Sequence, residues 1–134
     1  MHLNPDQQRK LIETAINARK WAYAPYSHYK VGAALLTSSG KIYDGVNVEN
    51  AVFSETLCAE RVAIFKAVSE GEREFISIAV ATENGGSPCG SCRQVLAEFG
   101  LSTQVIIVDT TGTIHMDTTV NDLLPGAFIP EDLI

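Results

Sequence analysis

The amino-acid sequence predicts one α/β domain in which helices and strands alternate along the chain. The 134 residues are enough for one hydrophobic core but too few for two ordinary domains. Hydrophobic residues make up 46% and charged residues 19%, a balance typical of globular proteins. Apolar residues recur at helical spacing in some segments and form short continuous runs in others. Because no repeat, low-complexity tract or linker divides the chain, we expect one domain over residues 1–134.

The first predicted element is a helix that begins after Asn4. Asn4 can cap the helix, Pro5 suits its first position, and Gln7 can close a capping box. Ala24-Pro25 ends the helical pattern. An apolar stripe at helical spacing lies between: Leu11, Ile12, Ala15, Ile16 and Trp21. We expect the aromatic residues near its end to serve packing rather than a pocket: Trp21, Tyr23 and Tyr26.

Two strands should follow, over residues 31–36 and 42–46, because the turn-forming run Ser38-Ser39-Gly40 separates two apolar segments. Residues 47–54 read as a loop. A buried helix is predicted from Cys58 to Val68, where apolar residues occur nearly all round and Gly71 follows.

The remaining elements alternate in the same way. We expect a strand over residues 76–81, a helix over 89–99 that Gly100 closes, and a strand over 105–108. The run from Asp109 to Gly112 is only a tight turn, so the strand at 113–116 should return antiparallel to the previous one. A short helix at 120–124 and an irregular tail complete the prediction.

Charge and hydropathy exclude several classes of function. The formal net charge is −6, and basic residues never run longer than the pairs Arg9-Lys10 and Arg19-Lys20, which disfavours polynucleotide binding. No apolar run approaches membrane-spanning length. The segment from Met1 to Lys10 is polar and lacks the pattern of a secretory signal, so we expect no membrane partner and a cytoplasmic location.

The three cysteines form a candidate metal site. An odd number excludes a fully paired disulfide framework. Cys89-x-x-Cys92 places two sulfurs on one helical face, in a first turn after Pro88 where the helix dipole favours thiolates. Cys58, at another predicted helix start, would be the third ligand. Three protein ligands leave one position of zinc open for water, which is typical of catalytic rather than structural sites.

Glu60 and Arg61 are the candidate helpers at this site. Glu60 could take a proton from water and pass it on, provided that Cys58 lies at an irregular first turn, because residues two apart in a regular helix point to different sides. Three thiolates on Zn²⁺ sum to −1, and Arg61 could withdraw charge from the sulfurs by hydrogen bonding to them. Alone, each of these residues would be read as ordinary core or surface; their joint spacing favours the catalytic interpretation.

At this point the sequence resembles a known family. Cys58-Ala59-Glu60-Arg61 with Pro88-Cys89-Gly90-Ser91-Cys92-Arg93-Gln94 is similar to the small, homotetrameric, three-cysteine cytidine deaminases, within the wider zinc deaminase signature. Four further segments extend the resemblance over nearly the whole chain: Ala22 to Ser27, Val31 to Ala34, Asn47 to Asn50 and Leu123 to Phe128.

The resemblance implies a three-layer α/β/α fold with a mixed five-stranded sheet, one zinc ion per subunit, and a nucleoside substrate deaminated in pyrimidine salvage. Asn47 and Glu49 would hold the ribose hydroxyls, and the loop from Asn50 to Phe53 would wall the pocket. Ala59, within the first cysteine motif, is also assigned to substrate binding.

Two further positions follow from the resemblance. Tyr29 stands where the family usually has phenylalanine against the pyrimidine face, so this chain adds a hydroxyl there. Phe128 would reach the active site of a neighbouring subunit in a homotetramer. Arg93 and Gln94 are given no catalytic role.

Three alternatives remain open from the sequence. The substrate could be an aminated nucleoside antibiotic such as blasticidin S, although the loop Asn47-Val48-Glu49-Asn50 favours the ordinary nucleoside. A polynucleotide editor is disfavoured by the acidic balance and the tight turn before the last strand. The chain could instead be a non-catalytic zinc module, for which His28 or His115 would be a possible fourth ligand.

Overall fold

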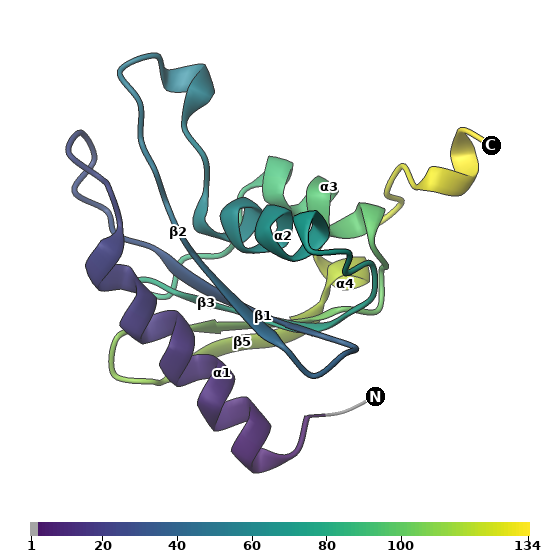
Figure 1. Cartoon of the computed structure of the whole chain (residues 1–134), viewed down its shortest axis with the longest axis horizontal. Coiled ribbons are helices and arrows are strands. Elements are labelled where there is room, and N and C mark those ends of the chain that lie inside the picture. Colours follow the sequence, from purple (N-terminus) through teal and green to yellow (C-terminus); the bar gives the residue numbers. More distant parts are fainter. Residues whose placement is uncertain (1–2) are drawn as a thin grey trace.

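The computed structural model describes residues 3–134 and contains one five-stranded sheet covered by helices on both faces (Figure 1). Its elements in chain order are α1 (Pro5–Ala18), η1 (Arg19–Trp21), β1 (Gly32–Thr37), β2 (Ile42–Val46), η2 (Phe53–Glu55), α2 (Ala59–Ser69), β3 (Phe75–Ala81), α3 (Gly90–Glu98), β4 (Gln104–Val108), β5 (Ile114–Thr119), α4 (Val120–Leu123) and η3 (Pro130–Asp132). Within residues 3–134, no helix combines the length and the apolar character that crossing a membrane requires.

The sheet has the strand order β2-β1-β3-β4-β5. Only β3 and β4 pair in parallel, and α3 forms the crossover between them. The predicted tight turn at 109–112 does return β5 antiparallel to β4. The mixed sheet and the α/β/α layering confirm the predicted fold class.

Two hydrophobic clusters lie on opposite faces of the sheet. The first joins α2 and α3 to the sheet through side chains such as Ile64, Leu96 and Val105. The second joins α1 to the other face through Leu11 and Ala15. Since α2 and α3 share one face, their first turns can meet at one end of the sheet.

Local chemistry explains where the helices start. Asn4 caps α1, and the full predicted capping box with Gln7 is present. The largest difference from the predicted boundaries is in the first helix, since α1 ends at Ala18 although the helical pattern was expected to run to Ala24. The strand β5 continues to Thr119, three residues past its predicted end, and Thr119 is also the N-cap of α4. None of the β5 side chains is buried, because β5 is an edge strand, so its apolar pattern is weak.

Trp21, Tyr23 and Tyr26, which were expected to serve packing rather than a pocket, are not buried in the core of the chain. Their side chains are 73%, 55% and 52% exposed. For Trp21 the reason is a change of helix type, because α1 ends at Ala18 and the following turn is the 3₁₀ helix η1, which no longer follows the apolar stripe of α1. Tyr23 and Tyr26 lie beyond η1, outside any helix.

Gly45 of β2 lets α2 pack very close to the sheet. A Cβ atom at this position would lie 2.4 Å from the carbonyl oxygen of Ala59 and 2.5 Å from the backbone nitrogen of Ala63. Gly32 of β1 has the same function toward α1, since its Cβ would lie 2.0 Å from the carbonyl oxygen of Ala15. Two glycines therefore set the distances between the sheet and the helices on each side.

Candidate active site and metal centre

The three cysteines lie at the first turns of two neighbouring helices. Cys58 is the N-cap of α2 and Cys89 is the N-cap of α3, and both have extended backbone. Neither side chain makes a capping hydrogen bond, so both sulfurs can face a shared ligand. Cys92 lies one turn into α3 and is buried. The helix N-termini place positive ends of two dipoles at the three sulfurs.

The distances between the sulfurs fit a zinc ion. The Cys58 and Cys89 Sγ atoms are 3.8 Å apart, those of Cys89 and Cys92 are 3.4 Å apart, and all three lie within 4.8 Å of one another. Sulfur ligands about 2.3 Å from a tetrahedral zinc would be about 3.8 Å apart. The three cysteines are therefore placed to hold one zinc ion per chain, and the fourth position is left for a non-protein ligand.

Glu60 is buried beside these sulfurs and is only 4% exposed. The condition stated from the sequence is met: Cys58 has φ −74° and ψ 153°, so it lies outside the helical periodicity and shares a cavity with Glu60. Burial raises the pKa of the Glu60 carboxyl above its ordinary value, and the negative charge of Cys58 raises it further. A raised pKa makes the Glu60 carboxylate a stronger proton acceptor than an exposed one.

Arg61 contacts the metal site from outside. Its Nη2 atom donates to Cys58 Sγ at 3.4 Å. The pKa of the Cys58 thiol is lowered to about 5, mainly because the Cys92 thiol donates to it and also because Arg61 does. The pKa of Cys92 is raised by the same bond, by burial and by the charge of Glu60. The predicted placement of Arg61 at the sulfurs is thus observed for one sulfur.

A cavity of about 300 Å³ opens beside the cysteines. This volume is at the lower end of the range for small-molecule sites. Six of the residues singled out from the sequence line the cavity: Tyr29, Asn47, Glu49, Cys58, Glu60 and Cys89. The rest of the lining consists of Ser27, Val31, Thr56, Leu57, Val80, Thr82, Gly86 and Ser87. Polar side chains and two of the three cysteines therefore line one small cavity.

Asn47 and Glu49 are already bonded to the segment before β1. Asn47 Oδ1 accepts from the backbone of Val31 at 3.0 Å, and its Nδ2 donates to the Tyr29 carbonyl at 2.7 Å. Glu49 accepts from the backbone nitrogens of Tyr26 and Ser27 and from the Ser27 hydroxyl. These bonds, the hydroxyl first, hold the pKa of Glu49 below its ordinary value. Sequence reasoning missed Ser27, whose only signal is a position next to the aromatic segment.

The other predicted contact residues lie outside this lining. Asn50 accepts from the backbone of Val52 at 2.9 Å and shapes the loop that extends from the sheet in Figure 1. Ala59 is fully buried under β2. Phe128 is 55% exposed in the C-terminal segment, and its carbonyl accepts from Gln94 at 2.8 Å.

Neither candidate histidine joins the cysteines. His115 Nε2 lies 2.8 Å from Asp109 Oδ2, and His28 is exposed in the turn before β1. Among residues 3–134, the cluster that could hold a metal contains the three cysteines alone. This placement disfavours a closed four-ligand structural site.

Arg93, which was given no catalytic role from the sequence, ties the cysteine segment to the end of α4. Its Nε donates to the Pro88 carbonyl at 2.9 Å and its Nη1 to the Leu123 carbonyl at 2.7 Å. The signal was its position directly after Cys92, where a long donor can reach back over the first turn. Arg93 therefore fixes the backbone that carries Cys89.

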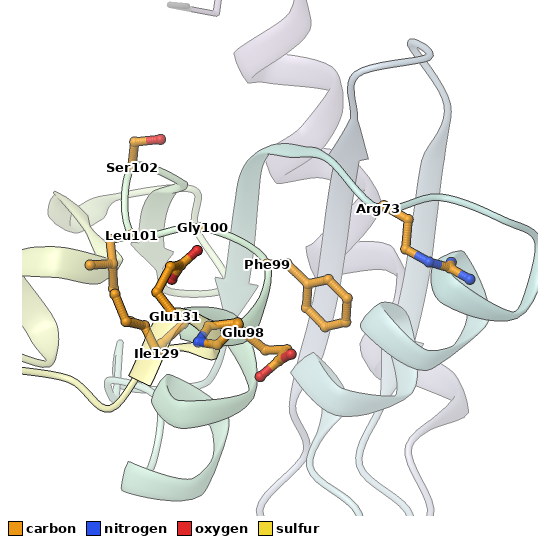
Figure 2. A pocket seen from close by; sticks show the side chains of 10 residues that line it. Arg73, Glu98, Phe99, Gly100, Leu101, Ser102, Ile129 and Glu131 are labelled. Carbon is orange, nitrogen blue, oxygen red and sulfur yellow. The ribbon is translucent and has the colours of Figure 1, made fainter. Parts of the chain in front are cut away.

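A wider hollow of about 810 Å³ lies between the end of α3 and the C-terminal segment (Figure 2). Glu98 and Glu131 lie on one side of Phe99, and Arg73 points away from both of them. The Arg73 guanidinium donates hydrogen bonds to the carbonyls of Val68 and Glu72. Although this hollow is larger, its lining contains no thiol and no buried acid, so the chemistry belongs to the cavity at the cysteines.

The fold and the site together define a class of protein: small α/β enzymes that carry a three-thiolate zinc site beside a buried acid. The family model for the cytidine and deoxycytidylate deaminase zinc-binding region matches residues 5–108. The chain therefore belongs to the cytidine and deoxycytidylate deaminase family and is a zinc-dependent enzyme.

Individual relatives agree with this assignment. A cytidine deaminase of Sporosarcina psychrophila is 54% identical over 127 residues, which cover 92% of this chain and 93% of the relative. The crystal structure of cytidine deaminase from Burkholderia pseudomallei superposes with a TM-score of 0.85 at 48% identity, covering 90% of this chain and 98% of that one. A blasticidin-S deaminase of Bacillus cereus is less similar, at 31% identity over 129 residues, with 89% and 90% covered.

Proposed function

We propose that this chain, as one domain over residues 1–134, converts cytidine and deoxycytidine to uridine and deoxyuridine by hydrolytic deamination. The observation that carries this proposal is the buried acid Glu60 on the wall of the 300 Å³ cavity that Cys58 and Cys89 also line. The cytidine deaminases at 54% and 48% identity support the choice of nucleoside.

In the proposed mechanism, Glu60 moves the protons. It accepts a proton from the water whose oxygen adds to C4 of the pyrimidine, and it donates that proton to N3. It then transfers the second proton of the water to the exocyclic amine, so that the C4–N bond breaks, ammonia leaves and C4 becomes a carbonyl. Zinc, when bound, supplies the Lewis acidity that lowers the pKa of water to about 7. This use of the glutamate is general among zinc deaminases.

Asn47 and Glu49 are proposed to bind the ribose hydroxyls with the capacity that their present bonds leave. A carboxylate can accept about four hydrogen bonds, and Glu49 accepts three. Asn47 uses one of two amide protons and one of two acceptor positions. Each side chain therefore has room for a sugar hydroxyl, while the bonds to the preceding segment hold both side chains in place.

The remaining substrate contacts are proposed from the resemblance. Tyr29 would face the pyrimidine ring, and Asn50 and Ala59 would complete the binding wall. Phe128 would contribute to the binding wall of a neighbouring subunit in a homotetramer. Exposed aromatic side chains on the two segments that extend from the sheet in Figure 1 support such an assembly: Phe53 is 77% and Phe128 55% exposed. We place the activity in cytoplasmic pyrimidine salvage.

Light scattering during size-exclusion chromatography tests the assembly. We expect the mass of four chains. Phe128→Ala should raise the KM for cytidine because it removes a contact from the neighbouring site. A monomer with full activity would contradict both the assembly and the role of Phe128.

Ultraviolet absorbance of cytidine tests the reaction. Zinc-loaded protein should shift the spectrum to that of uridine, and a chelator should stop the shift. Glu60→Gln should abolish turnover and keep zinc bound, since it changes the proton carrier but no sulfur. Glu98→Gln, an exposed carboxylate on α3, is the matched control and should keep wild-type turnover. Normal turnover by Glu60→Gln would contradict the proton-transfer role.

Two alternatives are outcomes of the same assay. If blasticidin S is consumed and cytidine is not, the antibiotic is the substrate; the 31% relative makes this worth measuring. If zinc is bound but neither compound releases ammonia, the metal serves only to link α2 and α3. Single-stranded DNA should not compete with cytidine.

A further inference from the structure

Tyr29 is mounted on a turn whose backbone is held in an unusual conformation. His28, directly before it, has φ 59°, in the left-handed region that non-glycine residues rarely adopt. The turn is fixed from both sides: the His28 N–H donates to the Ala24 carbonyl at 3.0 Å, and the Tyr29 N–H donates to the Ser27 hydroxyl at 3.0 Å. These bonds fix the backbone from which the Tyr29 side chain projects.

The hydroxyl of Tyr29 reaches the segment that leads into Pro88 and Cys89. It donates to Asn84 Oδ1 at 2.6 Å, across a sequence separation of 55 residues. That segment is itself anchored, because the Gly86 N–H donates to the hydroxyl of Thr82 at 2.8 Å, and Thr82 is 2% exposed at the end of β3. Two parts of the cavity wall thus meet at one phenol oxygen.

The Tyr29 hydroxyl occupies the space that a side chain at position 86 would need. A Cβ atom on Gly86 would lie 2.6 Å from Tyr29 Oη. The next neighbours are Asn84 Oδ1 at 3.6 Å and Tyr29 Cζ at 3.8 Å, which are ordinary contacts. Unlike Gly85, which has φ +74°, Gly86 has a backbone conformation open to other residues, so a side chain at 86 would have to displace the Tyr29 hydroxyl and nothing else.

We propose that Tyr29 and Gly86, with Asn84 as the hydrogen-bond acceptor, form a specificity-determining pair that sets the width of the nucleoside cavity. Both residues line that cavity, at its aromatic wall and at the segment before Cys89. Because the hydroxyl touches the segment directly, a larger residue at 86 displaces the aromatic wall into the space for the base. The inference rests on the proposed function, and it assigns roles to Asn84 and Gly86 in addition to Tyr29.

A double-mutant cycle with the zinc-loaded protein tests the pair. Kinetics with cytidine are measured for wild type, Tyr29→Phe, Gly86→Ala and the double variant. Removing the hydroxyl alone should raise KM about threefold, and Gly86→Ala should raise it about tenfold or more, with kcat within about threefold, because binding is weakened equally before and during reaction. The double variant should return to the KM of Tyr29→Phe, since Phe leaves room for the Ala methyl group.

Effects of the two substitutions that simply multiply, or a Gly86→Ala enzyme equal to wild type, would overturn the proposal. Should Gly86→Ala not fold, the double variant must still fold; its failure also overturns the proposal. Tyr23→Phe, which removes a phenol hydroxyl from an exposed side chain, is the control and should behave as wild type.

The failure of the pair and the failure of the proposed function give different results. If wild type deaminates cytidine but the cycle is additive, the pair is refuted and the function stands. If wild type does not act on cytidine, the proposed function fails, and the same four proteins are compared by thermal unfolding instead. Gly86→Ala should lower the unfolding midpoint temperature, and adding Tyr29→Phe should restore it. Additive shifts of the midpoint would refute the pair there too.

Discussion

Gly45→Ala should impair catalysis more than its effect on stability would suggest, because it moves the helix that begins at Cys58. The new Cβ would lie 2.4 Å from the Ala59 carbonyl oxygen, whereas ordinary contact begins at 3.4 Å, so α2 has to retreat by about 1 Å. Overpacking of this kind costs about 1–3 kcal/mol of unfolding free energy. A displacement of about 1 Å at catalytic groups lowers the rate about 100-fold. Glu60 lies next to Ala59, so it moves with the backbone.

The assay combines urea unfolding, zinc content and kcat/KM for cytidine. Gly32→Ala provides the stability control, because its Cβ meets the Ala15 carbonyl at 2.0 Å on the opposite face, toward α1. Gly90→Ala provides the positional control: Gly90 directly follows Cys89, yet its Cβ would meet nothing within 4 Å, so turnover should stay within about twofold of wild type. If Gly32→Ala lost as much kcat/KM as Gly45→Ala at equal loss of stability, the reasoning from helix placement would be refuted.

Three further perturbations follow from single contacts. Arg61→Met removes the donor to Cys58 and should lower kcat or zinc affinity about 10–100-fold, checked by kinetics and zinc titration; no change in either would contradict its role. Burial raises the pKa of Tyr43 from 10.0 to about 12, so the neutral phenol contributes stability below pH 10 that is lost as the pH rises toward 12. Tyr43→Phe should remove this loss of unfolding free energy between pH 10 and 12, measured by unfolding at a series of pH values. An unchanged pH dependence would contradict the prediction. Gln94→Ala frees the Phe128 carbonyl and should speed amide exchange in the C-terminal segment, with unchanged exchange as the contrary result.

Local signals in the sequence predict most of the fold. The cap at Asn4 and the tight turn after Asp109 act through neighbouring residues only, and both are observed. The exposure of Trp21 was not predictable in this way, because the change from α1 to a 3₁₀ turn depends on how the chain reaches β1. The length of β5 was underestimated because an edge strand has little apolar pattern to read.

The sequence predicts the cysteines and Glu60 of the candidate site well, but it predicts the contacts among the residues that line the cavity much less well. Spacing along α3 brings Cys89 and Cys92 together, and the local sequence places Cys58 at the start of α2; the fold then brings the two helix starts together by packing α2 and α3 on one face of the sheet. The contacts of Ser27 with Glu49 and of Tyr29 with Asn84 join segments 22 and 55 residues apart. Such pairs are set by the packing of the whole chain, and a single sequence carries no local pattern for them.

Three thiols within 4.8 Å also give the metal a protective role. When zinc is removed in air, Cys58, with its pKa of about 5, is a thiolate at neutral pH and lies 3.8 Å from the Cys89 sulfur. A disulfide formed by any two of the three leaves a third thiol beside it, which can attack and exchange the bond. Oxidised chains would thus interconvert among three cross-links, none of which binds zinc with three sulfurs. The metal-free protein keeps its capacity to recover activity only where a reductant is present.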